Sequence, residues 1–473
     1  MPLLLALDGT TGWRAARLGY VAGAVSALGL LYWTSFVVVQ YGGLPLPVGI
    51  TVMVALCLAF ALFPALFGWA QGRVCRSFGT AGLLAAPFLW VSTELLRVHT
   101  FFEFPWCLLG YSQYRNLPVI QVASVGGVYG VSFIVASSSA LLAFATRAKE
   151  GSRRRAAFFA LIGIVGGAWS GGAWVMKRPL EESGRVRVGL VQGGIRQDEK
   201  WDKDAGWKHV LVHLDLTDQA AARGARLVVW PESAVPFLYD ENPAFAQTLR
   251  WTAQRLGIYL FFGNDDREVS GGEERDLVGA KMIDPTGNVV LRYHKIHLVP
   301  FGEYVPLQPI FTFGGRFGAK LVRQVSDFVP GTKAVVGPVD GHLVGGYICY
   351  EAIFPGLARR FAAAGAELLV NVTNDAWYGT TSAPHQHLAM AALRAVENRR
   401  YMVRAANTGI TAVVDPFGRI LAPTTLFDRT VLVRDVAFIS GKSFYTRHGD
   451  LLARGCAAIA LAFLAATIRR RLP

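Results

Sequence analysis

Long uncharged stretches alternate with short basic connections over the first 180 residues. No Asp, Glu, Lys or Arg occurs in the 55 residues 18–72. A helix needs about 20 apolar residues to cross a bilayer, so this stretch can hold two crossings, separated by a Gly- and Pro-rich turn. Together with the later uncharged runs, the pattern predicts six membrane-spanning helices, at about 18–38, 48–69, 78–96, 119–144, 156–175 and 451–468.

The pattern changes at about residue 181. From there to about residue 450, charged residues are frequent and apolar residues come in short β-rich runs separated by helical patterns. Alternating strands and helices over this length indicate one layered α/β domain. Strands are predicted at 185–192, 226–230, 258–263, 277–283, 343–349, 367–372 and 401–414, and helices at 204–223, 243–256, 354–364 and 384–400.

The chain is therefore expected to have three parts: a transmembrane bundle (1–180), an α/β domain (181–450), and a last spanning helix with a basic tail (451–473). Within the α/β domain, the Pro-, Phe- and Gly-rich segment 305–330 is predicted to be a mobile apolar loop at the membrane interface.

Composition and charge fit a membrane protein. Of 473 residues, 52% are hydrophobic and only 17% are charged, which argues against a disordered chain, a coiled coil or an ordinary soluble enzyme. The formal net charge is +14, and basic residues gather in short connections such as 147–155 and in the tail 469–471. Because cytoplasmic loops are enriched in Lys and Arg, we expect both termini in the cytoplasm and the α/β domain outside the cytoplasmic membrane. This pattern also explains the arginine runs better than nucleic-acid binding does.

One cysteine is a candidate nucleophile. Cys349 is the only cysteine of the predicted α/β domain, so it has no disulfide partner within that domain. A lone cysteine is often an inert buried residue, but this one follows an apolar strand and precedes a predicted helix. A nucleophile at a sharp strand-to-helix turn is presented to substrate, and the backbone N–H groups after it can bind a developing oxyanion.

A cysteine nucleophile needs a base and a cation, because an ordinary thiol is only a few per cent ionised at neutral pH. Glu232 lies just past an apolar strand, at the strand edge where α/β proteins place their ligand sites. Lys295 is also expected to come after a strand, and Glu303 lies eight residues further on. Taken singly, Glu232 could be a charge at a helix start and Lys295 a surface residue.

A metal centre is not expected. His385 and His387 could supply two ligands, but no third ligand stands at a useful spacing. We therefore favour a packing or capping role at a helix start for this pair.

Taken together, the candidate segments resemble a known family. Trp-Pro-Glu-Ser (230–233), His-Lys-Ile-His-Leu-Val-Pro-Phe-Gly-Glu (294–303) and Ile-Cys-Tyr-Glu (348–351) resemble the Glu–Lys–Cys triad segments of the nitrilase superfamily. A longer match is similar to the bacterial apolipoprotein N-acyltransferases, and it includes Asn-Asp-Ala-Trp-Tyr-Gly (374–379), Pro-His-Gln-His (384–387) and Arg-Ala-Ala-Asn-Thr-Gly-Ile-Thr (404–411).

The resemblance implies a fold and a place in the cell. It implies a multi-span α-helical membrane bundle with an extracytoplasmic, nitrilase-like αββα sandwich, in the bacterial cytoplasmic (inner) membrane, with the sandwich on the periplasmic side. The family usually has eight spans, so this chain departs from the pattern at its start, where about one and a half spans are unmatched.

The resemblance also implies a reaction. Cys349 would attack the ester of a membrane phospholipid and form a thioacyl-enzyme. The acyl chain would then pass to the α-amino group of the N-terminal S-diacylglyceryl cysteine of an apolipoprotein, the last step of bacterial lipoprotein maturation. The two partners would be the phospholipid donor and the diacylated apolipoprotein acceptor, without a cofactor.

Particular residues would carry this reaction in the family. By resemblance, Glu232 would be the general base and Lys295 would stabilise the oxyanion. Glu303 and Glu351 would hold Lys295 and the nucleophile loop. Two aromatic residues, Trp201 and Tyr350, would lie near the acyl or acceptor site.

Two other functions are compatible with parts of the sequence. In a membrane-tethered amidase or nitrile hydrolase, water rather than an amine would discharge the acyl-enzyme. In a receptor or transporter, the α/β domain would only bind a ligand, and the triad argues against this. The multi-span bundle and the length of the resemblance favour transfer over hydrolysis.

Overall fold

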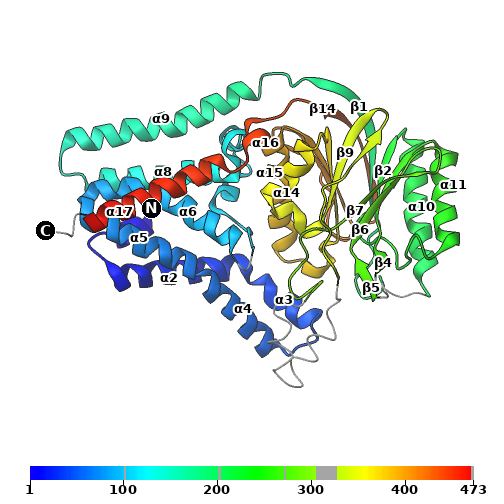
Figure 1. The fold of residues 1–473 in the computed structure, drawn as a ribbon, viewed down its shortest axis with the longest axis horizontal. Coiled ribbons are helices and arrows are strands. Elements are labelled where there is room, and N and C mark those ends of the chain that lie inside the picture. The colour runs from blue at the N-terminus through cyan, green and yellow to red at the C-terminus, as the bar shows by residue number, and fades with distance from the viewer. Residues whose placement is uncertain (101–102, 201–203, 271–272, 305–327, 470–473) are drawn as a thin grey trace. The chain divides into compact units, whose positions relative to one another are not determined.

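The chain divides into two compact units, which we describe separately. The computed structural model describes residues 1–100, 103–200, 204–270, 273–304 and 328–469 (Figure 1). The first unit comprises Met1–Pro179 and Ser443–Pro473, and the second comprises Leu180–Lys442. The second unit is therefore a single insertion in the chain of the first. Trp201 and most of the predicted apolar loop lie outside the described residues.

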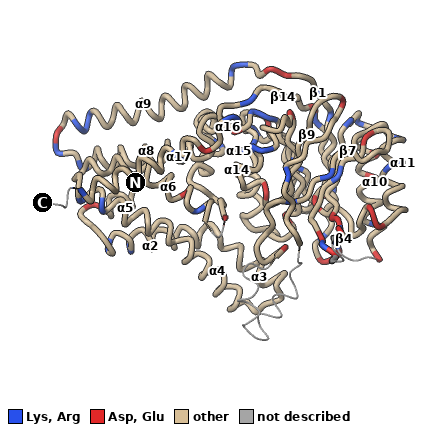
Figure 2. Tube along the Cα trace, in the orientation of Figure 1, with Lys and Arg blue, Asp and Glu red and all other residues tan. Residues whose placement is uncertain are grey.

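All the regular secondary structure in the described residues of the first unit is helical. Its charged side chains gather near helix ends, and long stretches of helix carry none (Figure 2). Helix α2 packs along α5, and α8 packs against α6, α9 and α17. The helices are α1 (Pro2–Ala6), α2 (Gly12–Leu31), α3 (Trp33–Gln40), α4 (Leu46–Phe60), α5 (Leu62–Phe78), η1 (Gly79–Ala85), α6 (Ala86–His99), η2 (Leu109–Gln113), α7 (Leu117–Ile120), α8 (Ala123–Arg147), α9 (Gly151–Val175), α16 (Phe444–His448) and α17 (Leu451–Arg469).

Within the described residues, four helical stretches are long and apolar enough to cross a membrane: Leu46–His99, Ala123–Arg147, Gly151–Val175 and Leu451–Arg469. The pair Gly12–Leu31 and Trp33–Gln40, bent by 53°, makes a fifth if it counts as one span. Five of the six predicted spans fall within these stretches, and the sixth, 119–144, begins four residues before Ala123–Arg147. The number differs because two of them, 48–69 and 78–96, lie in the 54-residue stretch Leu46–His99, which is far longer than the roughly 20 residues of one crossing.

The second unit is a four-layer α/β sandwich. One six-stranded sheet has the order β14-β1-β2-β3-β6-β7 and the other has the order β13-β12-β11-β10-β9-β8. Helices α10 (Gly206–Ala222) and α11 (Pro243–Leu256) cover the first sheet, and α14 (Pro355–Ala363) and α15 (Ala383–Asn398) cover the second (Figure 1). This arrangement confirms the predicted nitrilase-like α/β fold.

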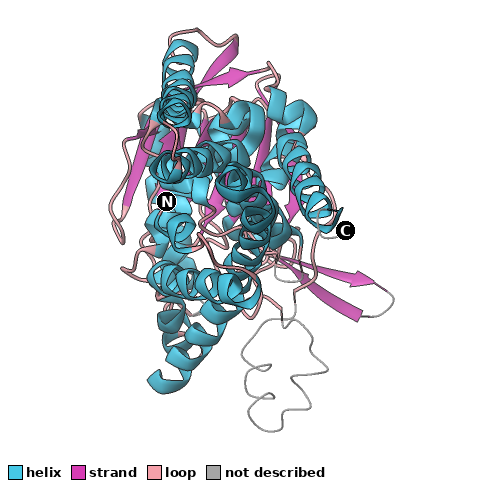
Figure 3. Cartoon of the chain, turned by 90° about the vertical axis from the view of Figure 1, so that its left-hand side faces the viewer, coloured by secondary structure: helices cyan, strands magenta, loops and turns pink. Residues whose placement is uncertain are grey.

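The strands of the first sheet are β1 (Glu182–Gln192), β2 (Leu227–Val229), β3 (Tyr259–Gly263), β6 (Gly279–Ile283), β7 (Val289–His294) and β14 (Thr430–Ile439). Those of the second are β8 (Val336–Val339), β9 (His342–Ile348), β10 (Leu368–Thr373), β11 (Tyr401–Ala406), β12 (Ala412–Val414) and β13 (Ile420–Leu421). A separate two-stranded ribbon joins β4 (Asp266–Ser270) to β5 (Glu273–Leu277) (Figure 3).

One strand prediction is wrong. Residues 401–414 form two antiparallel strands, β11 and β12, rather than one. The chain reverses at Asn407–Gly409, between two apolar runs of the same character. The side chain of Thr411 helps to close this reversal, since its hydroxyl accepts the N–H of Ala406 at 3.0 Å.

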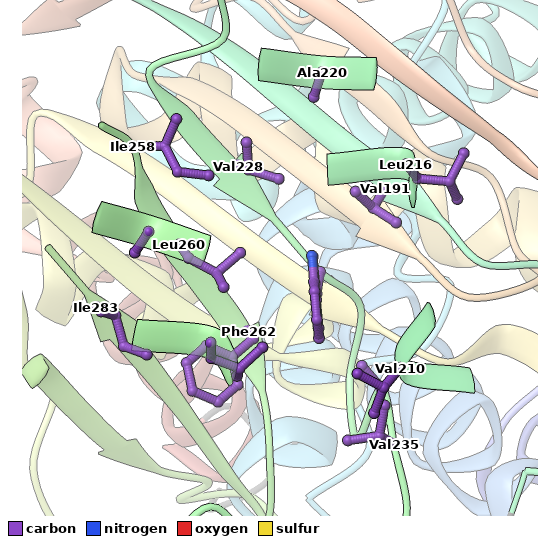
Figure 4. Packing of buried hydrophobic residues seen from close by; sticks show 14 of the residues in the cluster. Val191, Val210, Leu216, Ala220, Val228, Val235, Ile258, Leu260, Phe262 and Ile283 are labelled. Atoms are coloured by element: carbon purple, nitrogen blue, oxygen red, sulfur yellow. The ribbon is translucent and has the colours of Figure 1, made fainter. Parts of the chain in front are cut away.

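One hydrophobic core of the second unit lies between the first sheet and its two helices. Alternate residues of the strands, including Val228, Leu260 and Phe262, meet apolar residues of α10 such as Val210 and Leu216 (Figure 4). All of these side chains are buried. The short β-branched and aromatic runs of the sequence form strands because both faces of the sheet are covered.

The two sheets approach closely at one glycine. Gly346 of β9 faces Phe261 of β3, and a Cβ at residue 346 would lie only 2.3 Å from the Phe261 ring. The aromatic ring of one sheet therefore fills the space that a side chain of the other would need. This contact fixes the spacing of the layers next to the strand that leads to Cys349.

Candidate active site

The three predicted triad residues lie together in the second unit. Glu232 lies three residues beyond β2, while Lys295 directly follows β7 and Cys349 directly follows β9. The Nζ of Lys295 lies 3.2 Å from Oε1 of Glu232. The charges of Glu232 and Lys295 both act on the Cys349 thiol. The three side chains thus come together from strand ends that are far apart in the sequence.

Two carboxylates hold Lys295. Its Nζ donates to Oε1 of Glu303 at 2.6 Å and to Oε1 of Glu232 at 3.2 Å. The other oxygen of Glu303 accepts the N–H of Val299 at 2.8 Å. Burial by itself lowers the pKa of Lys295, but Glu303 and Glu232 outweigh burial and raise the pKa well above its ordinary value. The ammonium therefore keeps its charge at neutral pH.

Cys349 occupies a strained turn at the end of β9. Its φ of +51° lies in the left-handed region that residues with a Cβ disfavour. Burial and the Glu232 carboxylate raise the pKa of its thiol, whereas Lys295 and a hydrogen bond with the Thr373 hydroxyl lower it, and the net change is upward. The resting side chain is therefore a thiol, whose proton must leave when the sulfur attacks.

The carboxylate of Glu232 has a fixed orientation. One oxygen accepts from Lys295, and the other accepts the backbone N–H of Asn374 at 2.8 Å. The backbone carbonyl of Glu232 accepts from the buried Nζ of Lys200 at 3.0 Å. The base candidate is thus held from both its side chain and its main chain.

Glu351 ties the nucleophile turn to the lysine segment. Its Oε2 accepts the N–H of Ile348, at 2.7 Å, just before Cys349. Its Oε1 accepts the hydroxyl of Tyr293 at 2.7 Å and the N–H groups of Ile296 and His297 at 2.6 and 3.2 Å. Burial raises the pKa of Glu351 to about 7, although these donors favour its charged form. One buried side chain therefore links the ends of β7 and β9.

The remaining predicted residues differ in how far the structure describes them. Tyr350 is buried beside Cys349, and its ring centroid lies 5.2 Å from that of Phe354. Trp201 lies outside the described residues. Its neighbour Lys200 was not predicted, although it stands in the same run. Asp265 was not predicted either. It accepts from Ser233 at 2.9 Å, and its position in a charged turn gave no signal.

The two histidines of the predicted pair differ in their surroundings. Within the described segments, no group of three or more His, Cys, Asp and Glu residues could hold a metal ion. His385 is exposed, whereas His387 is fully buried among hydrogen-bond partners. The predicted capping or packing role therefore misses the contacts of His387, which join it to Asp375 and to the main chain of Cys349.

Both units match known family models. Residues 1–141 match the apolipoprotein N-acyltransferase N-terminal domain, and residues 187–443 match the carbon-nitrogen hydrolase family. Among solved structures, an amidase from Nesterenkonia sp. has 23% sequence identity and a TM-score of 0.41, covering 59% of this chain and 98% of the amidase.

Full-length relatives carry the same name in several bacteria. The apolipoprotein N-acyltransferase of Geobacter metallireducens is 39% identical over 99% of this chain and 90% of its own length. That of Methylococcus capsulatus is 35% identical over 94% of this chain and 86% of its own length. The chain therefore belongs to the apolipoprotein N-acyltransferase family, an acyltransferase family of the carbon-nitrogen hydrolase superfamily.

Proposed function

We propose that this protein moves a fatty acyl chain from a membrane phospholipid, through a thioester on Cys349, to the α-amino group of a diacylated apolipoprotein. The observation that carries the proposal is the buried group of Cys349, Lys295 and Glu232, in which the charges of an ammonium and of an oriented carboxylate both act on the thiol. Family membership supplies the substrate class.

In the first half-reaction, Cys349 attacks the ester carbonyl of the phospholipid. The thiol proton passes to Glu232 as the S–C bond forms. The Lys295 ammonium and the N–H groups that follow Cys349 stabilise the negative oxygen of the tetrahedral intermediate. Collapse of the intermediate breaks the C–O bond, and the departing lysophospholipid takes the proton from Glu232.

In the second half-reaction, the neutral α-amine of the apolipoprotein attacks the thioester. Glu232 accepts a proton from the attacking nitrogen and returns it to the sulfur as the C–S bond breaks. An amide forms and the thiol is restored. Because Glu303 also neutralises Lys295, the site can hold the ammonium while Glu232 is protonated.

Burial of the triad suits transfer rather than hydrolysis. Cys349 and Lys295 are 5% and 1% exposed. A thioester in such a place meets little water, so it can persist until an amine arrives. Limited access of water favours transfer of the acyl chain to an amine over its hydrolysis.

We further propose that the protein lies in the bacterial cytoplasmic membrane with its second unit on the periplasmic side and both termini in the cytoplasm. The long apolar helices of the first unit and the basic connections between them support this topology.

Intact-mass analysis after incubation with phospholipid tests the reaction. We expect the wild-type protein to gain the mass of one acyl chain and to lose it when a diacylated lipopeptide is added. Cys349→Ala and Cys349→Ser should remain folded and inserted but gain no mass. An acylated Cys349→Ala protein would reject the proposal. Equally fast loss of the acyl chain to water alone would show a hydrolase.

A further inference from the structure

A buried polar network lies next to the nucleophile, and the reaction above does not use it. The network consists of His387, Asp375, Arg404 and Thr373, each at most 1% exposed. His387 Nε2 lies 3.0 Å from the backbone oxygen of Cys349, and its Nδ1 lies 2.9 Å from Oδ1 of Asp375. The network therefore reaches the main chain of the residue whose sulfur would attack.

The partner of Nε2 fixes the role of this nitrogen. A backbone carbonyl can only accept a hydrogen bond, so Nε2 must carry a proton. Burial and the nearby Arg404 lower the pKa of His387, while Asp375 opposes them. Both the neutral ring of this tautomer and the imidazolium keep the Nε2–H. Donation to the Cys349 carbonyl is thus independent of the charge of the ring.

Asp375 is the centre of the network. Besides facing His387, it accepts from Arg404 Nη2 at 2.7 Å and from the Thr373 hydroxyl at 3.1 Å. Burial alone would raise the pKa of Asp375, but Arg404 and His387 hold it well below its usual range. Arg404 in turn donates to Asn371 of β10. Nδ1 of His387 lies 3.0 Å from Nη2 of Arg404, from which it accepts when the ring is neutral, and it donates to Oδ1 of Asp375 when the ring is charged. The ring is therefore oriented in both states.

The chain packs closely around Asp375. A Cβ at Gly409 would lie 2.5 Å from Oδ2 of Asp375. The hydroxyl of Thr373 also forms a hydrogen bond with the Cys349 thiol. The network therefore contacts Cys349 at two places, at its carbonyl through His387 and at its sulfur through Thr373.

We propose that His387 is a positioning residue for the nucleophile: its Nε2–H holds the Cys349 carbonyl and so keeps the strained turn in the conformation that aims the sulfur at the ester. The inference rests on the proposed nucleophilic role of Cys349. A turn with a positive φ relaxes unless neighbouring contacts hold it, and a small misplacement of a reacting atom can cost up to about 100-fold in rate.

Two substitutions of similar size separate hydrogen bonding from packing. His387→Gln keeps a donor of comparable reach, whereas His387→Leu fills the space without one. We expect acyl-enzyme formation at saturating phospholipid to fall roughly 10- to 100-fold in His387→Leu and to stay within about threefold of wild type in His387→Gln. Neither change should alter the phospholipid concentration for half-maximal rate by more than about twofold. His385→Ala, on the exposed face of the same helix, is the control and should behave as wild type.

The dependence of the acylation rate on pH separates positioning from proton transfer. Because the Nε2–H is present in both charge states, the rate of His387→Gln should follow pH in parallel with the wild-type rate. Loss of an acidic limb in this variant would show that His387 transfers protons and would overturn the positioning role.

Other outcomes also decide the matter. A wild-type rate in folded His387→Leu, or an equally slow His387→Gln, would overturn the proposal. If the Leu variant does not fold, as judged by its melting temperature and gel filtration, His387→Asn replaces it, because the amide is one methylene shorter and should be slow. Activity retained in Cys349→Ala would instead reject the nucleophile itself, so the two failures remain distinguishable.

Discussion

A buried lysine that keeps its charge is the most demanding residue of the site. Burying an ammonium is unfavourable unless opposite charges accompany it, and Lys295 has Glu303 at 2.6 Å and Glu232 at 3.2 Å. Burial and the Glu232 carboxylate favour a protonated thiol at rest, and a proton on Glu232 removes the charge of that carboxylate during the reaction.

Replacing this cation should affect chemistry more than substrate binding. In Lys295→Met, we expect acyl-enzyme formation to slow about 100- to 1000-fold, the range found when an oxyanion donor is lost. Rapid-quench mass analysis of the acylated fraction measures this rate. Lys281→Met is a matched control, because Lys281 is also buried and paired, with Asp266 at 2.5 Å, and lies outside the triad. Unchanged acylation in Lys295→Met would remove the residue from its proposed role.

Individual residues were predictable from the sequence only where a motif marked them. Cys349 and Glu232 stand at the ends of predicted strand ranges, the strand before Lys295 (β7) is not among those ranges, and the resemblance joined the three residues into one triad. Contacts between distant segments could not be predicted. The Asn374 N–H that orients Glu232 lies 142 positions away, and no local pattern reports such a pairing.

At the scale of elements, the spacing between the two sheets depends on a glycine, Gly346. In Gly346→Ala, the added methyl group would meet the Phe261 ring. Because that ring is fully buried, overpacking should cost about 1–3 kcal/mol of stability. Thermal unfolding of the detergent-solubilised protein measures the loss. The control is Gly356→Ala in α14, where a Cβ meets nothing within 4 Å. An unchanged melting temperature in Gly346→Ala would show that the layers yield easily.

A histidine on α10 makes the stability of the second unit depend on pH. His213 is fully buried against Trp230, and burial lowers its pKa to about 4 from an ordinary 6.5. The unfolded chain therefore binds a proton at a higher pH than the folded chain does. The stability that neutral, buried His213 contributes is complete above about pH 6.5 and is lost as the pH falls towards 4. Between pH 7.5 and pH 5, this histidine should lower the free energy of unfolding by about 2 kcal/mol.

The measurement compares two proteins at two pH values. Two kcal/mol corresponds to a drop of roughly 4–8 °C in melting temperature for a unit of this size. His213→Phe cannot titrate, so its melting temperature should fall less than that of wild type over the same interval. Equal falls in both proteins would assign the pH dependence to other groups.

Elements were predicted well where apolar runs were unbroken and less well elsewhere. The runs at 226–230 and 258–263 became β2 and β3 within a residue or two. The hairpin of β11 and β12 was read as one strand, although the reversal at Asn407–Gly409 carries the Asn and Gly that are typical of turns. In the second unit, Arg394 and Glu397 of α15 are fully buried as an ion pair at 2.9 Å, and a charge pattern alone cannot distinguish such a pair from an exposed face.

At the scale of the whole molecule, charge asymmetry predicts which side of the membrane each connection occupies. Lys149, between α8 and α9, and Lys333, in the second unit, are both exposed. In spheroplasts, a membrane-impermeant maleimide should label Lys333→Cys at once and Lys149→Cys only after permeabilisation. The unsubstituted protein, with its five cysteines, gives the background. Equal labelling of both variants in intact spheroplasts would contradict the topology.

The pairing of β1 with β14 bears on how the protein is made. These strands open and close the inserted unit and run antiparallel, from Glu182 opposite Ile439 to Gln192 opposite Thr430. On the proposed topology, β1 waits until nearly the whole insertion has crossed the membrane before β14 can cover its free edge. An unpaired strand edge invites association with other chains. Chaperones on the far side of the membrane would therefore matter most during export of this unit.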